Sequence, residues 1–233
     1  MPAVPGLIRV GHKGADHVAP GNTVESFEAA LEHGVDMIEF DVLRARDGRL
    51  VLAHDYEDAE SRDCLTLEEG LDHFAGEAYA GIELDVDMKL PGYEREVAEG
   101  LHERGLAERS LVSTMYTDSL DRLGELAPGL RRGWSVPRVR RDYTRSALAV
   151  PAYAMARVMR ARLPGQAAAR IRAGGCEAVM AHRILVGRRL VDAVHAAGGQ
   201  VYVWTVDDAG RIRAMEALGV DGVITNDPRL FSP

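Results

Sequence analysis

The sequence is poor in cysteine and contains no long apolar run. Cys64 and Cys176 are the only cysteines among 233 residues, too few for a disulfide framework, and nothing near them indicates a metal or redox centre. No apolar stretch approaches the length of a membrane-spanning helix, and no charged-then-apolar leader precedes the first expected strand. We therefore expect a cytoplasmic protein rather than a secreted or membrane-spanning one.

Lysine is nearly absent. The chain has 28 basic residues, of which only Lys13 and Lys89 are lysine, so the remaining 26 are arginine. Lysine presents a compact point charge, whereas arginine presents a planar fork of donors. Both lysines lie beside other ionisable residues, which favours point contacts with a ligand, although chance placement of two lysines would give the same pattern.

Strand-like runs and helical patterns alternate along the chain. The expected strands are Leu7 to Val10, Met37 to Leu43, Ile82 to Met88, Leu111 to Met115, Leu130 to Val136, Glu177 to Ala181, Gln200 to Val206 and Gly222 to Thr225. Helical patterns between them include Thr23 to His33, Tyr93 to Arg104, Thr117 to Leu126, Arg188 to Ala197 and Asp208 to Leu218. Eight such alternations predict an α/β fold, a parallel (β/α)8 TIM barrel, as a single domain over residues 1–233.

Two features modify this expected barrel. Only five residues follow Asp227-Pro228, so the final helix should be incomplete or modified. After the second strand, the stretch between His54 and Ile82 leaves room for only a short insertion, a loop and one helix. The capping box Thr66-Leu67-Glu68-Glu69 would open that helix. The mouth of the barrel should therefore be relatively open.

The second expected strand carries two carboxylates, Glu39 and Asp41. Side chains alternate along a strand, so these two point to the same side. Two carboxylates on one face repel, and a hard divalent cation with oxygen ligands, Mg²⁺ or Ca²⁺, is the simplest compensation. The alternative is an edge strand on which both acids face solvent, while Ile38 and Phe40 take the buried face.

The third expected strand holds the densest run of ionisable residues. Glu83, Asp85, Asp87 and Lys89 alternate with apolar residues and therefore share one face. In a barrel the apolar face packs against the helices, so the charged face points into the barrel and toward its top.

Two histidines lie at strand-to-loop transitions. His12 follows the first strand, next to Lys13. His54 follows the apolar run Leu50 to Ala53, and the turn Arg46 to Arg49 brings this run back toward the end of the second strand. A lone histidine is usually structural, but two in such positions suit a general acid and a general base.

As an ordered set, these motifs resemble the glycerophosphodiester phosphodiesterase family, whose signature reads HRG, PENT with a following Phe, GxDxIExDV and DGxxVxxHD. The corresponding residues here are His12-Lys13-Gly14, Pro20-Gly21-Asn22-Thr23 with Phe27, Gly34 to Val42, and Asp47-Gly48 leading to His54-Asp55. Further matches at Trp204 to Asp207 and Gly219 to Pro228 extend the resemblance over nearly the whole chain.

The resemblance implies metal-dependent hydrolysis of glycerophosphodiesters to an alcohol and glycerol phosphate. It implies that Glu39, Asp41 and Asp87 hold one divalent metal ion, Mg²⁺ or Ca²⁺. It also implies that Lys13 and Lys89 contact the substrate phosphate. Asp87 stands where the family has Glu, which shortens the reach to a metal and leaves room for a neighbouring acid to contribute through water.

The resemblance further implies that His12 and His54 catalyse proton transfer on opposite sides of phosphorus, without indicating which of them is the base. Trp204 would stack against the alcohol portion of the substrate. Lys13 replaces the family's Arg and loses its bidentate phosphate contact, so a weaker KM or an altered substrate is expected.

Two alternative functions remain. A lysophospholipase D-type phosphodiesterase acting on lipid substrates would use the open mouth. A non-catalytic phosphodiester-binding barrel is disfavoured, because both histidines and all three acids are present. A purely structural barrel would leave the inward acids of the third strand uncompensated, which is costly.

Arginine is concentrated in residues 131–172, which hold eleven arginines and one acid, Asp142. This segment has a net charge of +10, so the remainder carries −18 of the total of −8. Its part from Ala152 to Leu163 is also apolar. Peripheral contact with an anionic membrane, or guidance of an anionic substrate, would explain such a segment; a solvated helix paired with the acidic remainder is the alternative. Nucleic acid is not expected as a partner, because the chain is acidic and lacks a recognition motif.

Overall fold

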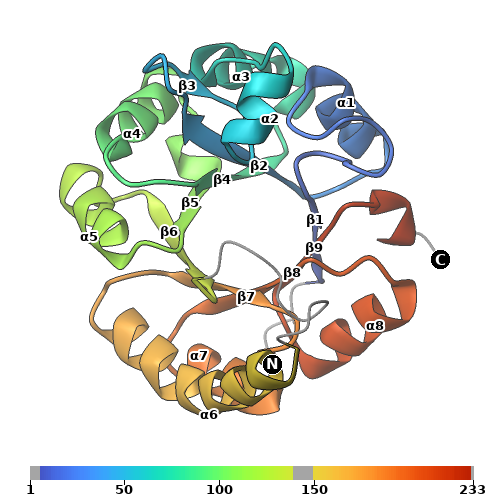
Figure 1. Cartoon of the computed structure of the whole chain (residues 1–233), viewed down its shortest axis with the longest axis vertical. Coiled ribbons are helices and arrows are strands. Elements are labelled where there is room, and N and C mark those ends of the chain that lie inside the picture. The colour runs from blue at the N-terminus through green and yellow to red at the C-terminus, as the bar shows by residue number, and fades with distance from the viewer. Residues whose placement is uncertain (1–5, 139–148, 232–233) are drawn as a thin grey trace.

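Eight parallel strands close into a barrel in the computed structural model, which describes residues 6–138 and 149–231 (Figure 1). The first barrel strand pairs with both the second and the last, which closes the sheet. The barrel strands are β1 (Ile8–Gly11), β2 (Met37–Arg44), β4 (Glu83–Met88), β5 (Ser110–Thr114), β6 (Arg131–Val136), β7 (Ala178–His182), β8 (Gln200–Trp204) and β9 (Gly222–Thr225). The predicted (β/α)8 barrel is confirmed.

Helices surround the barrel and connect its successive strands (Figure 1). They are α1 (Val24–Glu32), α3 (Leu67–Phe74), α4 (Glu94–Glu103), α5 (Thr117–Leu126), α6 (Ala149–Arg172), α7 (Arg188–His195) and α8 (Ala209–Leu218), with 3-10 turns η1 (Glu77–Tyr79) and η2 (Ala107–Arg109). The last strand is followed by a 3-10 turn, η4 (Pro228–Phe231), instead of an α-helix. This agrees with the expected modified end. None of the helices within the described ranges is both long and apolar enough to cross a membrane.

The insertion after β2 is short, as expected, but contains one more helix than the sequence predicted. A two-residue strand, β3 (Leu50–Val51), pairs antiparallel with β2, and the unpredicted helix α2 (Tyr56–Ser61) follows it. Asp55 caps α2 by accepting a hydrogen bond from the Asp58 N–H at 3.0 Å. The predicted capping box of α3 is present: Thr66 Oγ1 accepts from the Glu69 N–H, and Glu69 Oε2 accepts from the Thr66 N–H.

Alternation along the strands divides the core into an outer and an inner part. Ile38, Phe40 and Val42 of β2 point outward, are fully buried and pack against the surrounding helices. The outer core includes packed aromatic rings: Phe74 stacks on Phe40 at a centroid distance of 5.0 Å and meets Phe27 in a tilted arrangement at 4.7 Å. The alternate residues of the same strand therefore point into the barrel interior.

The barrel interior changes character along its axis. At the amino-terminal end of the strands, Glu83 pairs with Arg131 at 2.6 Å. Beside this pair lies an apolar cluster of Val10, Met37, Leu111, Ala178, Met180, Tyr202 and Ile224. The inward acids of β2 and β4 follow, so the carboxyl ends of the strands carry the polar groups.

Described parts of the arginine-rich segment pair with acids or lie in the core. Arg132 pairs with Glu177 and Arg170 with Asp121, while Leu163 and Ala167 of α6 are buried in the core. These contacts agree with the alternative of a helix paired with the acidic remainder. The acid of this segment and its arginines at 140, 141 and 145 lie outside the described residues.

Glu94, at the start of α4, is a buried carboxylate that ties α4 to α5. It is 3% exposed and accepts hydrogen bonds from Ser119 Oγ at 2.6 Å and the Gly92 N–H at 3.0 Å. We expect Glu94→Ala to lower the free energy of unfolding by about 2–3 kcal/mol, because it leaves buried donors unpaired. Glu94→Gln keeps an acceptor and should cost about 1 kcal/mol. Urea unfolding measures both changes, with Glu99→Gln, an exposed residue of α4, as control.

The effect of Glu94 should also depend on pH. Burial raises the pKa of Glu94, but the hydrogen bonds from Ser119 and Gly92 outweigh it and hold the pKa below its ordinary value. The stabilisation is therefore fully present above the ordinary carboxyl pKa and is lost as pH falls through the lowered pKa. The difference between wild type and Glu94→Gln should shrink on acidification; a constant difference would contradict this account.

Candidate active site

The register between β2 and β4 brings acidic side chains together. Asp41 lies opposite Asp87, and Glu39 lies opposite Asp85. One carboxylate oxygen each from Glu39, Asp41 and Asp87 can be chosen so that all lie within 4.8 Å of one another. The three predicted metal-binding residues are thus brought into one cluster, with Glu39 and Asp41 buried.

Lys89 supplies positive charge to this cluster. Its ammonium pairs with Asp41 and, at 2.6 Å, with Asp87. Burial lowers the pKa of Lys89, but the neighbouring carboxylates outweigh burial and raise the pKa well above its ordinary value. Lys89 therefore stays charged inside the barrel mouth.

One ammonium does not neutralise the neighbouring acids. Burial, followed by the charge of Asp41, raises the pKa of Glu39 well above its ordinary value. Burial raises the pKa of Asp85 to about 8, although a hydrogen bond from Ser113 opposes this. Burial also acts on Asp41, but Lys89 and the two histidines hold the pKa of that carboxyl below its ordinary value.

These residues fit a divalent cation. Three oxygen donors converge from Glu39, Asp41 and Asp87, which is the ligand chemistry of Mg²⁺ and Ca²⁺. The buried Asp85 Oδ1 has no hydrogen-bond partner in the described structure, so a further oxygen atom beside the cluster is left unsatisfied. Glu83, the other neighbouring acid, is engaged by Arg131.

A hydrogen-bond chain orients His12. Asn226 Nδ2 donates to Asp207 Oδ2 at 2.8 Å, and the Asn226 N–H donates to Asp207 Oδ1 at 2.8 Å. A carboxylate only accepts, so the amide must turn its Oδ1 toward His12. His12 Nδ1 lies 2.5 Å from that oxygen and is therefore the protonated ring nitrogen. The other nitrogen, Nε2, is 3.9 Å from Glu39 and faces the acidic cluster.

His54 lies at the rim, on the segment between β3 and α2. Its Nδ1 is 3.1 Å from Asp55 Oδ2, and its backbone N–H donates to Asp58 Oδ2 at 3.0 Å. Its side chain is 52% exposed, against 21% for that of His12. The two predicted catalytic histidines thus reach the site from different segments, one half-buried and one open to solvent.

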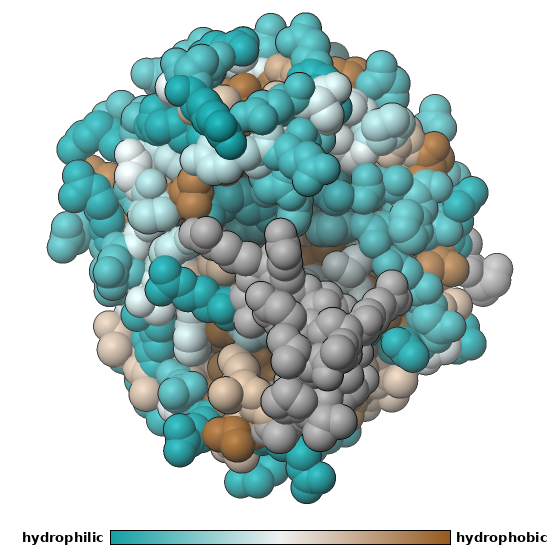
Figure 2. Space-filling model, viewed as in Figure 1, coloured by the Kyte–Doolittle hydropathy of each residue, from teal (hydrophilic) through white to brown (hydrophobic). Residues whose placement is uncertain are grey.

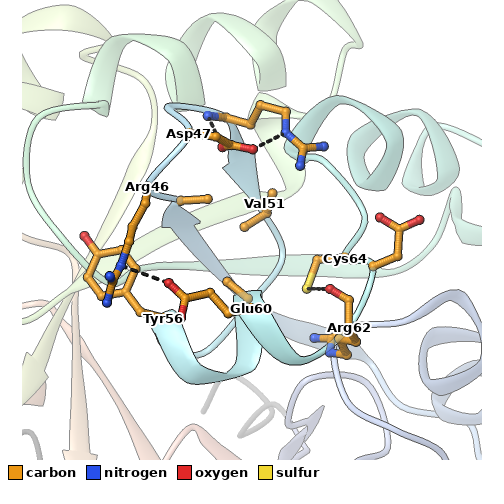
Figure 3. Close-up of a pocket in the computed structure, with 11 residues that line it drawn as sticks. Arg46, Asp47, Val51, Tyr56, Glu60, Arg62 and Cys64 are labelled. Atoms are coloured by element: carbon orange, nitrogen blue, oxygen red, sulfur yellow. Dashed lines mark hydrogen bonds and ion pairs between the residues drawn. The ribbon is translucent and has the colours of Figure 1, made fainter.

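A second depression lies between β3 and α2, next to the segment that carries His54 (Figure 3). Arg46 pairs with Glu60 at 2.9 Å across this depression, and Asp47 pairs with Arg49 at 2.8 Å. These charges are matched within the depression. Its lining residues all differ from those of the cavity that both histidines line.

The loop after β1 supplies backbone and amide donors to the acids. The Lys13 N–H donates to Glu39 Oε2 at 2.8 Å, and Asn22 Nδ2 donates to Asp41 Oδ2 at 2.9 Å. Both Lys13 and Asn22 adopt positive φ, 50° and 60°, which is uncommon for non-glycine residues. Gly14 also has positive φ, and a Cβ there would meet the Ser26 backbone at 2.6 Å. The loop is thus folded tightly against β2 and α1.

The cavity holds about 200 Å³ and is lined by His12, Glu39, His54, Asp85, Asp87, Lys89, Ser113, Met115, Ser135, Met180, Trp204, Thr205 and Ile224. Trp204 forms part of its wall, donates from Nε1 to the Met180 carbonyl at 2.8 Å and meets the ring of His182 edge-on. Lys13 is not among the lining side chains; its ammonium pairs with Asp16 at 2.7 Å. A contact between Lys13 and substrate stays a prediction.

Sequence reasoning assigned no role to Asn22, Asp207 or Asn226, although each lies in a motif used to recognise the family. All three orient predicted site residues: Asn22 holds Asp41, and the other two hold His12. The sequence did offer one sign of Asp207 and Asn226: each is a polar residue that directly follows an expected strand.

The model of the glycerophosphoryl diester phosphodiesterase family matches residues 12–64 and 56–230 of the chain. The chain belongs to this family. This phosphodiesterase family member is 26% identical to the glycerophosphodiester phosphodiesterase of Caldanaerobacter subterraneus subsp. tengcongensis, with 94% of this chain and 93% of the relative aligned. The family is one of phosphoric diester hydrolases, and the predicted family membership is confirmed.

Solved structures with similar folds support the barrel of this family member. A glycerophosphodiester phosphodiesterase from Agrobacterium tumefaciens aligns with a TM-score of 0.69 at 20% identity, covering 97% of this chain and 98% of that one. A phosphodiesterase from Oleispira antarctica, solved with the product sn-glycerol-3-phosphate, aligns with a TM-score of 0.69 at 20% identity, covering 97% and 94%. At these identities the likeness shows a shared fold.

Because the acidic cluster is incompletely neutralised, a divalent cation should bind the folded protein and stabilise it. At a hundredfold excess over Kd we expect Mg²⁺ or Ca²⁺ to raise Tm by roughly 5–10 °C. Asp41→Asn and Asp87→Asn should abolish most of this shift, whereas Glu216→Gln, an exposed acid on α8, should keep it. Differential scanning calorimetry with EDTA and with each metal makes the measurement. A wild-type Tm unchanged by both metals would exclude a cation site here.

Proposed function

We propose that this chain hydrolyses small glycerophosphodiesters to an alcohol and glycerol phosphate, with the aid of one divalent metal ion. The observation that carries the proposal is the shared cavity: two histidines from different segments line it together with Glu39, Asp87 and Lys89. Family membership supports the reaction class. The Oleispira protein, which was solved with glycerol phosphate, supports the identity of the product.

Glu39, Asp41 and Asp87 would hold the metal, Mg²⁺ or Ca²⁺. A bound divalent ion supplies electrostatic stabilisation for charge on the phosphate oxygens. Lys89 lines the cavity and keeps its proton, so its ammonium can bind a phosphate oxygen directly. Ser113 adds a hydroxyl to the wall, and Trp204 offers an apolar surface for the alcohol.

We assign the base to His12. Its Nδ1 hydrogen is committed to Asn226, which leaves Nε2 as a free acceptor pointing toward the acidic cluster. Burial lowers the pKa of His12, despite the opposing effect of Asp41, which favours the neutral ring. His12 would take the proton from the attacking oxygen, and His54, at the rim and oriented by Asp55, would give a proton to the leaving alkoxide.

The size of the cavity favours a small diester. Its volume of about 200 Å³ is below the roughly 300–1,000 Å³ typical of pockets that enclose drug-sized ligands. A glycerophosphodiester head group suits such a space. The second candidate, a lysophospholipid, is compatible only if its acyl chain stays outside the cavity.

Replacing His54, the proposed general acid, should abolish most turnover but leave metal binding intact. We expect His54→Ala to lower kcat for glycerophosphocholine by about 10²–10⁴-fold, because the alkoxide would leave unprotonated. The stabilisation by Mg²⁺ or Ca²⁺ should persist. Steady-state assays with EDTA and with each metal restored, using glycerophosphocholine and lysophosphatidylcholine, test this. His102→Ala, an exposed histidine on α4, is the control, and full activity of His54→Ala would overturn its assignment.

Asn226 should act as a positioning residue through His12. Asn226→Ala removes the acceptor for the Nδ1 hydrogen, so the ring loses its fixed tautomer, and kcat should fall by about 10–100-fold. KM and Tm should change little, since no substrate contact is removed. Asp207→Asn should give a smaller kcat loss, because the Asn226 amide keeps its position but loses its enforced orientation. A change confined to Tm or KM would instead indicate a structural or binding role.

A further inference from the structure

A basic cleft lies between α6 and α7, separate from the catalytic cavity. It has a volume of about 470 Å³ and is lined by the side chains of Arg157 and Arg160 from α6 and of Arg188 and Arg189 from α7. None of the described residues that line it is acidic. The Arg160 guanidinium lies against the start of α7: a Cβ on Gly187 would stand 2.6 Å from its Nη2.

The four cleft arginines have no carboxylate partner among the described residues, and all four are exposed. Other arginines of the chain, such as Arg44, Arg62 and Arg104, form ion pairs. In a chain with a net charge of −8, four arginines grouped without an acid form a local positive surface.

Large apolar side chains are exposed next to this surface. On α6, Met155 is 61% exposed and Val158 is 47% exposed, one helical turn apart. They are two of the four large hydrophobic side chains that the described residues expose. Over α6, brown hydrophobic atoms lie directly beside teal hydrophilic ones (Figure 2). A soluble anionic ligand would need no such apolar neighbours, whereas an anionic lipid surface matches both features.

The basic cleft shares the catalytic face of the barrel. α7 begins after the carboxyl end of β7, whose last residue, His182, packs its ring against Trp204 of the cavity wall. The amino-terminal half of α6, which carries Met155, Val158 and the two α6 arginines, follows the carboxyl end of β6. Contact through this surface would place the mouth of the barrel next to whatever the surface binds.

We propose that the amino-terminal half of α6 and the start of α7 form a peripheral docking surface for anionic phospholipid membranes. Arg157, Arg160, Arg188 and Arg189 supply the electrostatic attraction, and Met155 with Val158 supplies apolar contact at the headgroup level. The partner is a lipid surface as a whole, and this docking is independent of the chemistry in the cavity.

Co-sedimentation of the full chain with vesicles tests the proposal. Wild type should bind phosphatidylcholine vesicles that contain phosphatidylglycerol and should bind pure phosphatidylcholine far more weakly. Each basic residue near an anionic surface contributes roughly fivefold to binding, so Arg157→Gln/Arg160→Gln should weaken binding at least about tenfold. Arg188→Gln/Arg189→Gln should act similarly. The matched control, Arg172→Gln/Arg213→Gln, removes two exposed arginines elsewhere and should bind like wild type.

Further experiments separate the apolar contribution to vesicle binding from the electrostatic one and test other ligands. Met155→Gln/Val158→Gln should weaken binding at both low and high salt, whereas the arginine pairs should matter only at low salt. Thermal melts check folding, and turnover of soluble glycerophosphocholine should be unchanged in all these variants. Equal binding to both vesicle types, equal loss in the control, or binding to a poly(U) oligonucleotide without binding to vesicles would each overturn the proposal. Co-sedimentation measures vesicle binding without any catalytic turnover, so a failure of this proposal can be distinguished from a failure of the proposed hydrolysis.

Discussion

The structure depends on how it compensates carboxylates that β-sheet register forces together. Pairing of β2 with β4 sets Asp41 opposite Asp87 and Glu39 opposite Asp85 at the barrel mouth. The Lys89 ammonium neutralises part of this negative charge, and hydrogen-bond donors from the loop after β1 stabilise the carboxylates further. The unusual left-handed backbone in that loop follows from this demand, because it turns an N–H and an amide toward the acids.

Along the barrel axis, the residues that stabilise the fold are separate from those of the candidate active site. Glu83 and Arg131 neutralise each other at the amino-terminal end, and an apolar layer that includes Met37 and Tyr202 fills the interior beside them. The carboxyl-terminal end carries the acidic cluster and the cavity. A polar group at that end can be exchanged or reoriented without opening the apolar layer, which is why this fold tolerates reactive groups on its rim.

Much of the fold was predictable from the sequence, because alternation is a local property. Expected strands and helices agree with the structure to within about two residues, and the inward direction of Asp85, Asp87 and Lys89 followed from a period of two. Contacts between distant segments could not be predicted in this way. His12 and Asn226 are 214 positions apart and meet only because the barrel closes. The ion pair between the Lys13 ammonium and Asp16 was not predicted either, and a contact between Lys13 and substrate stays a prediction. The extra helix α2 was missed because its six residues are too few to show a period.

The arginine-rich segment shows why composition alone could not decide between two interpretations. Folding divides it: Arg132 and Arg170 become partners of acids from other elements, while Arg157 and Arg160 line the basic cleft and have no acidic partner among the described residues. The pairing interpretation therefore holds for Arg132 of β6 and Arg170 of α6, whereas membrane contact through Arg157 and Arg160 is our proposal. The cavity volume bears on this proposal, because a space of about 200 Å³ suits a head group better than a whole lysophospholipid. A barrel held at a membrane by α6 and α7 would not need to enclose a lipid, since the bilayer itself would keep the apolar part of such a substrate.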